Sequence, residues 1–280
     1  MDCPHCPSTR VSLLQRKTSL GYDMFRCKSC RRTFNERTVT PFNFIEVPTD
    51  ILFQVLLCRV RYKLSYRDVS EFFLLRGFQF THETVRDWEE RFLPHFTDQI
   101  RTKRKGKVGK IWSVDETYVR VKGAWCYLYR GIDENGNLVD VRLSKTRDMA
   151  GTKAFFAEAF GLHEEAPEKV ATDGLASYPR AIEEELGKET KHEVRPCTAN
   201  PVEQSHRRIK HCYYPTLGFG EFEAAQRFCR AVDEMGNFLR PRSRMAEVVS
   251  LRTDKSALTL SRRERFMKGV EELGSLFQAA

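Results

Sequence analysis

Ile111-Trp112-Ser113-Val114-Asp115 is an apolar half-strand that ends on a carboxylate. The pattern of a β-strand continues from there through residue 121. A bare carboxylate in or beside a packed sheet costs several kcal/mol unless a cation or hydrogen-bond donors meet it. The stretch therefore predicts a strand and, on it, a position that needs a compensating positive charge.

Strand and helix patterns alternate after this stretch as far as residue 215. A turn centred on Asn135-Gly136 joins the second and third strand patterns, and the later strands are reached through helices. This order predicts an α/β fold with a mixed five-stranded sheet, an antiparallel meander followed by crossovers, and flanking helices. The predicted segments are strands 111–121, 125–132, 138–144, 169–172 and 192–196 and helices 149–160, 177–186 and 201–212.

Two further carboxylates stand at the ends of predicted elements. Asp173 ends the strand 169–172, and Glu203 lies in the first turns of a helix that opens with Asn200-Pro201. If the two strands are neighbours and the helix packs across them, Asp115, Asp173 and Glu203 meet at one edge. Three carboxylates repel one another, and two Mg²⁺ ions would remove that repulsion. The simpler alternative is that Asp115 caps a turn and Glu203 interacts with the helix dipole.

Basic residues follow Glu203 on its helix. Arg207 lies about one turn after Glu203 and shares roughly its face. Lys210 lies seven residues after Glu203, two turns on and on the same face. Both side chains could hold a DNA phosphate beside the carboxylates.

Two cysteine pairs open the chain, Cys3-Pro4-His5-Cys6 and Cys27-Lys28-Ser29-Cys30, with 20 residues between them. Four thiolates from two such pairs supply the tetrahedral ligand set of a structural Zn²⁺. The pattern predicts a zinc ribbon over residues 1–40, with Cys3, Cys6, Cys27 and Cys30 as ligands. A redox pair or chance clustering is the alternative.

Residues 45–100 predict a helix-turn-helix DNA-binding domain. A capping box starts at Ser65, Gly77 ends that helix, and Thr81 caps the next helix, whose outward residues include His82 and Arg86. A helical hairpin that reads no DNA is the alternative.

Residues 101–110 are predicted as a basic linker, either solvated or lying along phosphates, and its cations include Lys103, Arg104, Lys105 and Lys107.

The composition favours a polyanionic partner. Among 280 residues, Lys and Arg number 47 against 38 acidic residues, a formal net charge of +9. We expect no membrane association, because no apolar run approaches the ~18 residues of a span, and no signal peptide. Nine cysteines, an odd count, argue against a disulfide framework and favour the cytoplasm.

An amphipathic helix is predicted over 221–239, and residues 241–280 form a basic tail with a short helix at 270–277.

Five blocks of the sequence carry a resemblance to a known family: Trp112–Val119, Gly123–Asp133, Ser144–Asp148, Thr172–Tyr178 and Asn200–Lys210. In this order they resemble the DDE transposases of prokaryotic insertion sequences, and they are most similar to the insertion-sequence-six family. The resemblance covers about residues 45–240. The zinc ribbon is absent from many members of that family, and its role does not follow from the core.

This resemblance implies a ribonuclease-H-like catalytic domain over 111–240. It implies two catalytic Mg²⁺ ions, replaceable by Mn²⁺. Asp115 would bridge both ions, and Asp173 and Glu203 would each complete the ligand set of one ion. Water would free a 3′-OH at the element's end, and that 3′-OH would attack target DNA, leading to cointegrates. Lys210 matches the family's basic residue that grips terminal DNA. The expected partners are the terminal inverted repeats, target DNA and at least a second copy of the chain, in a nucleoid-associated protein.

Two other functions fit part of the sequence. A non-catalytic DNA-binding regulator or domesticated relative would use the ribbon and the helix-turn-helix, but would gain nothing from three intact carboxylates. A general nuclease on the same core would share the metal site and would need no module for end recognition. Metal-dependent nicking of a terminal repeat separates the first alternative from a transposase, and equal cleavage of unrelated duplexes would favour the second.

Overall fold

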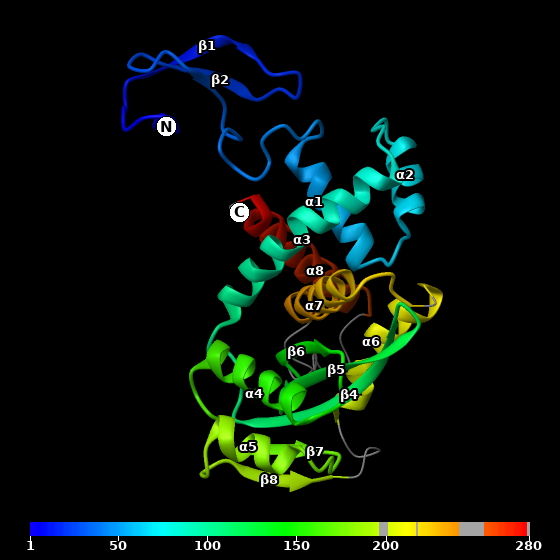
Figure 1. The fold of residues 1–280 in the computed structure, drawn as a ribbon. Helices are drawn as coiled ribbons and strands as arrows, with labels where there is room; N and C mark the ends of the chain where they lie inside the picture. The colour runs from blue at the N-terminus through cyan, green and yellow to red at the C-terminus, as the bar shows by residue number, and fades with distance from the viewer. Residues whose placement is uncertain (196–200, 217, 241–254, 279–280) are drawn as a thin grey trace.

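The computed structural model describes residues 1–195, 201–216, 218–240 and 255–278. Within the helices, the side chains at positions 201, 203–205, 214–216 and 255–263 are outside this description. The predicted cap at Asn200 and the part of the predicted tail at 241–254 also lie outside the described residues. In chain order, a small ribbon, a group of helices and a sheet with its own helices follow one another along the molecule (Figure 1).

The main sheet has the strand order β6-β5-β4-β7-β8. Strands β4 (Ile111–Val121), β5 (Ala124–Asp133) and β6 (Leu138–Ser144) form the antiparallel meander. Strands β7 (Lys169–Thr172) and β8 (Lys191–Val194) add to it in parallel. This is the mixed five-stranded sheet that the sequence predicts, an antiparallel meander followed by parallel crossovers, and that prediction is confirmed.

Helices cover both faces of this sheet. Helices α4 (Met149–His163) and α5 (Tyr178–Leu186) pack on one face, where Val114 belongs to the same buried cluster as Phe155. Helices α6 (Pro201–Thr216) and α7 (Phe222–Phe238) pack on the other, where Leu128 and Val232 share a cluster. Because successive strand residues point to opposite faces, Val114 faces α4 and α5 whereas Asp115 faces α6.

The N-terminal helices follow the predicted caps. α1 (Thr49–Val60) is followed by α2 (Tyr66–Leu74), which begins with a complete capping box between Ser65 and Asp68. α3 (His82–Arg104) begins at the Thr81 cap, whose hydroxyl accepts a hydrogen bond from the Thr84 N–H. α3 continues through the first four residues of the predicted linker, because Gly106 is the first residue there that interrupts a helix.

The C-terminal helix is longer than the short helix predicted at 270–277 within the basic tail. Residues Lys255–Gln278 form one helix, α8, which packs on α1 and α3. Phe277 lies among the rings of Phe53, Phe92 and Phe96, with centroids 5.3–6.3 Å away. The prediction was too short because the apolar spacing is clear only over the last turns, after a polar and basic first half.

The ribbon contains β1 (Val11–Lys17), β2 (Asp23–Cys27) and β3 (Thr33–Phe34), all antiparallel. All three strands lie within residues 1–40, the range predicted for the ribbon. Gly21, in the turn between β1 and β2, has φ +86°, a conformation that glycine adopts without strain.

Among the described residues, no helix combines the length and the hydropathy that a bilayer span requires.

Candidate active site

The register of two strands brings Asp115 and Asp173 together. β7 runs parallel to β4, with Ser113 paired to Ala171. Two residues further along each chain, Asp173 therefore comes beside Asp115. Carboxylate oxygens of Asp115, Glu116 and Asp173 all lie within 4.8 Å of one another. Two of the three predicted carboxylates thus meet at the edge where β7 ends.

Glu116, which is not among the site residues predicted from the sequence, joins this cluster. Its buried carboxylate accepts a 2.6 Å hydrogen bond from the Tyr178 hydroxyl and pairs with the Arg147 guanidinium. The same guanidinium lies 3.6 Å from an oxygen of Asp173. Burial raises the pKa of Glu116, and the Asp173 charge adds to that effect, whereas the Tyr178 hydrogen bond opposes it. The cluster therefore holds more negative charge than Arg147 compensates.

Asp115 is fixed by contacts from its own strand and from α6. One carboxylate oxygen accepts a 2.9 Å hydrogen bond from the Glu116 N–H, and the other lies 3.5 Å from His206 Nε2. His206 is fully buried, and its Nδ1 lies 3.1 Å from Arg130 Nη1. Because a guanidinium only donates hydrogen bonds, Nδ1 accepts this one, and the imidazole proton stands on Nε2, toward Asp115.

Arg130 is itself held by Asp233 of α7 through two hydrogen bonds of 2.6 and 2.7 Å. Arg130 is paired with Asp115 across the β4–β5 ladder. The chain of contacts Asp233–Arg130–His206–Asp115 therefore joins α7, β5, α6 and β4 below the carboxylate. This chain limits the positions that the Asp115 carboxylate can take.

Glu203 lies in the first turn of α6, and its side chain is outside the described residues. His206, three residues further along and hence on a neighbouring part of the same face, contacts Asp115. The start of α6 is therefore docked at the acidic cluster, as the sequence analysis predicts for the helix that carries Glu203.

The cluster has the donor set of a magnesium site. Asp115, Glu116 and Asp173 offer oxygen ligands only, which is what Mg²⁺ prefers. Their mutual repulsion in a buried position also calls for a cation. The residues present therefore fit divalent metal ions.

Most of the predicted DNA-binding side chains reach the surface. His82 and Arg86, at the start of α3, both contact Glu83, at 3.1 and 2.8 Å. Lys107 and Arg207 are exposed, Lys210 is half-buried. Lys103 lies 3.9 Å from Glu272, and Lys105 pairs with Glu164, in exposed ion pairs that contribute little and can exchange for phosphate contacts.

Arg104 is the exception among these cations. It is 6% exposed, and its Nε and Nη2 atoms donate 2.6 Å hydrogen bonds to the two oxygens of Glu234. Nη1 donates to the carbonyl oxygens of Leu138 and Val139, at 2.9 and 3.0 Å. The interpretation of Arg104 as a DNA contact is therefore wrong: its helix continues into the core and buries the side chain there.

The four ribbon cysteines form a second candidate metal centre. The Sγ atoms of Cys3 and Cys30, and those of Cys6 and Cys27, lie 3.6 Å apart, and all four lie within 4.8 Å. A tetrahedron with Zn–S bonds of about 2.3 Å requires S···S distances of about 3.8 Å, and a disulfide requires about 2.05 Å. The cluster fits a zinc ion and contains no disulfide.

Backbone donors act on one of these thiols. The N–H groups of Cys30 and Ser29 point at Cys27 Sγ and lower the pKa of that thiol to about 6. Desolvation raises the pKa of Cys6 to about 12. A thiol that ionises easily is a ready metal ligand, because the thiolate is the ligating form.

Comparison with known proteins identifies the family to which the chain belongs. A family model described as a DDE domain matches residues 109–242. The transposase for insertion sequence-like element IS431mec of Staphylococcus aureus is 35% identical over 179 residues, 60% of this chain and 76% of that relative. The transposase for insertion sequence element IS257 in transposon Tn4003, from the same species, matches with the same identity and the same coverage.

Two solved structures are similar to part of this chain. A chain of the simian T-cell lymphotropic virus intasome in complex with PP2A regulatory subunit B56 gamma has a TM-score of 0.36 at 16% identity, over 46% of this chain and 49% of that chain. The HTLV-2 integrase catalytic core domain in complex with magnesium, in a trimeric form, has a TM-score of 0.34 at 19% identity, over 45% and 85% of the two chains. The family assignment rests on the sequence relatives.

A mixed five-stranded sheet with an acidic cluster at the β4–β7 edge, within a DDE domain, defines a DDE transposase. The two Staphylococcus aureus relatives identify the family within this class. The chain belongs to the insertion-sequence-six family of these transposases.

Proposed function

We propose that this transposase binds the terminal inverted repeats of its insertion sequence and performs metal-dependent strand cleavage and strand transfer that lead to a cointegrate. The observation that carries the proposal is the adjacency of Asp115 and Asp173, with the start of α6 docked beside them through His206. In the proposed site, Asp115, Asp173 and Glu203 hold the catalytic ions, Mg²⁺ or Mn²⁺.

Bound divalent ions in such a site activate the attacking oxygen and stabilise the leaving oxygen of a phosphodiester. The protein positions the ligands. The Glu116 N–H and His206 orient Asp115, and Arg130 and Asp233 orient His206. In the first step, water attacks the phosphodiester at the element's end and the 3′-oxygen leaves as 3′-OH. In the second, that 3′-OH attacks a target phosphodiester and displaces its 3′-oxygen.

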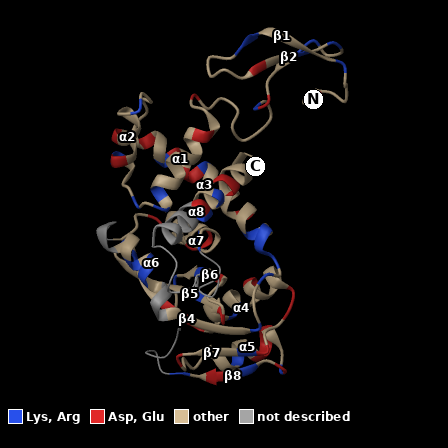
Figure 2. Ribbon diagram, turned by 180° about the vertical axis from the view of Figure 1, so that it is seen from behind, with Lys and Arg blue, Asp and Glu red and all other residues tan. Residues whose placement is uncertain are grey.

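The DNA would contact several separate elements. We assign phosphate contacts to Arg207 and Lys210 on α6, to Lys103 in the last turn of α3, and to Lys105 and Lys107 after that helix. We assign end recognition to the start of α3, with His82 and Arg86. Helix α6 and the C-terminal end of α3 carry Lys and Arg, whereas α5 carries a run of Glu (Figure 2). Because two ends must be joined, the working form is at least a dimer.

End-specific nicking tests the proposed function. The wild-type protein is expected to nick a labelled terminal repeat in Mg²⁺ or Mn²⁺ and to show no nicking in EDTA, because the buried carboxylates need the cations. Unrelated duplexes of equal length should be cut much less. Binding without nicking in any metal would instead indicate a DNA-binding regulator, and equal cleavage of both duplexes would indicate a general nuclease.

We also propose that Cys3, Cys6, Cys27 and Cys30 bind a structural Zn²⁺. Apart from these cysteines, Phe34 is the one fully buried side chain of the ribbon's cluster among the described residues, and Val11 and Phe25 are partly buried against it. Such a small cluster cannot hold three strands by burial, so the metal supplies the missing free energy.

Zinc removal should therefore unfold the ribbon and leave the core folded. After chelation, residues 1–40 are expected to become sensitive to limited proteolysis, while the main melting transition stays in place. Cys27→Ser should lose the bound zinc, measured as metal per chain, whereas Cys58→Ser, outside the ribbon, should keep it. A ribbon that stays protease-resistant in the metal-free protein would contradict the zinc proposal.

A further inference from the structure

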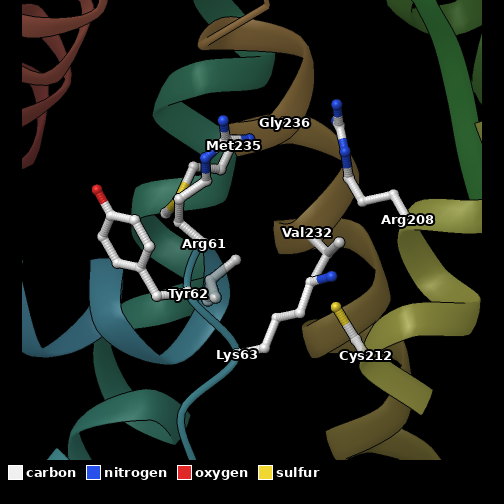
Figure 3. A pocket seen from close by; sticks show the side chains of 9 residues that line it. Arg61, Tyr62, Lys63, Arg208, Cys212, Val232, Met235 and Gly236 are labelled. Carbon is white, nitrogen blue, oxygen red and sulfur yellow. The ribbon is translucent and has the colours of Figure 1, made fainter. Parts of the chain in front are cut away.

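A cavity of about 350 Å³ lies between the end of α1, α6 and α7. Three basic side chains line it, Arg61 and Lys63 after α1 and Arg208 on α6, and no acidic residue is among its described lining (Figure 3). Arg208 follows His206 by two positions, so the two side chains point to different sides of α6. The cavity is therefore separate from the acidic cluster at Asp115.

The charge of Arg208 is not neutralised within the described part of the chain. Arg208 is half-buried, and no hydrogen bond or ion pair joins its guanidinium to a described residue. The acidic side chain that acts on it, Asp233, is already held by Arg130 at 2.6 and 2.7 Å. Burial lowers the pKa of Arg208; the Asp233 charge opposes that shift, and the Arg61 charge adds to it. A desolvated cation next to another cation is unfavourable unless an anion joins them.

Gly236 of α7 makes room for this guanidinium. A Cβ atom at position 236 would stand 1.6 Å from Arg208 Nη1, so no other residue fits while Arg208 keeps its place. Glycine inside a helix costs about 1 kcal/mol relative to alanine. The helix thus carries an unfavourable residue at the point where it allows an unpaired guanidinium to lie against its backbone.

We propose that this cavity binds a phosphate group of the DNA backbone. The proposal rests on the function proposed above and adds a site to it. A phosphate carries the anionic oxygens that a fork of guanidinium N–H groups recognises. The cavity lies between α1 of the N-terminal helices and α6 of the catalytic part, next to the exposed Arg207. One phosphate held there would tie both parts of the protein to the same DNA.

Salt-dependent DNA binding tests this site. The affinity of the full-length protein for a labelled duplex with a terminal repeat is measured over a range of salt concentrations. For R208Q we expect affinity about tenfold weaker on any sequence, and a slope of log Kd against log salt that is smaller by about 0.9, the value of one lost phosphate contact. Arg180→Gln, an exposed arginine on α5, is the matched control and should change neither quantity.

A second variant tests the position of the Arg208 guanidinium without changing the charge of the cavity. Gly236→Ala keeps every cation but displaces the Arg208 guanidinium, so it should weaken binding as R208Q does. In buffer without phosphate, R208Q should melt at the same temperature as the wild type or higher, because it removes an uncompensated cation. A clearly lower melting temperature for R208Q would show that the guanidinium has a structural partner, and it would overturn the proposal.

The other possible results of the binding and melting measurements each lead to a different conclusion. If the wild type binds the duplex and both variants keep its affinity and slope, the cavity holds no DNA phosphate. If inorganic phosphate or thymidine monophosphate raises the melting temperature of the wild type but not of R208Q, while the DNA slope stays unchanged, the site takes a free anion and the proposed DNA source is wrong. If the wild type binds no DNA at any salt concentration, the proposed function fails first.

Discussion

Asp115→Asn should fold and bind terminal DNA as the wild type does, while strand cleavage and joining fall by about 10³-fold or more. The substitution keeps the size of the side chain and the acceptor for the Glu116 N–H, but it removes the negative charge that faces Asp173 and the start of α6. Loss of a metal ligand in the proposed site would remove several kcal/mol of transition-state stabilisation, and each ~1.4 kcal/mol is a factor of ten in rate.

The measurement is single-turnover nicking of a labelled terminal repeat, with DNA affinity and melting temperature determined on the same preparations. Asp98→Asn, an exposed aspartate on α3, is the matched control and should keep the wild-type rate. Glu203→Gln is expected to resemble Asp115→Asn, and Glu116→Gln to lose less activity, because Tyr178 and Arg147 already bind the Glu116 carboxylate. A wild-type rate for Asp115→Asn would refute the proposed site.

The sheet and part of the site follow from local patterns. Alternation and turn residues are enough to place the five strands, and the strand order follows once the meander precedes the crossovers. Asp115 and Asp173 then meet because two parallel neighbours align them, with Ser113 beside Ala171. No long-range information is needed for that adjacency beyond the assumption that the two strands are neighbours.

Glu116 escaped prediction because strand alternation assigns it to the face opposite Asp115. The pairing of β7 with β4 ends at Ser113, so beyond that point an Asp173 carboxylate on the turn approaches side chains of both faces. Arg104 was misinterpreted for a related reason. A run of basic residues looks solvated in the sequence, and only the packing of α3 against β6 and α7 shows which of them is buried.

The buried ion cluster around Arg104 carries the second large prediction. Glu234 is fully buried, accepts both 2.6 Å hydrogen bonds from Arg104, and lies 3.4 Å from Arg101 Nη1. Burial by itself would lower the pKa of Arg101, but the hydrogen bond and the charge of Asp140 raise it above its ordinary value. Two arginines from α3 and two carboxylates from β6 and α7 are thus mutually dependent.

Glu234→Gln should therefore destabilise the protein by about 3–5 kcal/mol, because it leaves Arg104 buried without an anion. Urea denaturation measures the change. Glu164→Gln, which removes an exposed partner of Lys105, is the matched control and should have little effect. Because Arg104 joins α3 to the sheet, the variant should also let the N-terminal helices and the sheet unfold in separate transitions, seen as a split melting curve. A single transition at the wild-type midpoint would show that apolar packing between α3 and α7 holds the two parts together without the ion cluster.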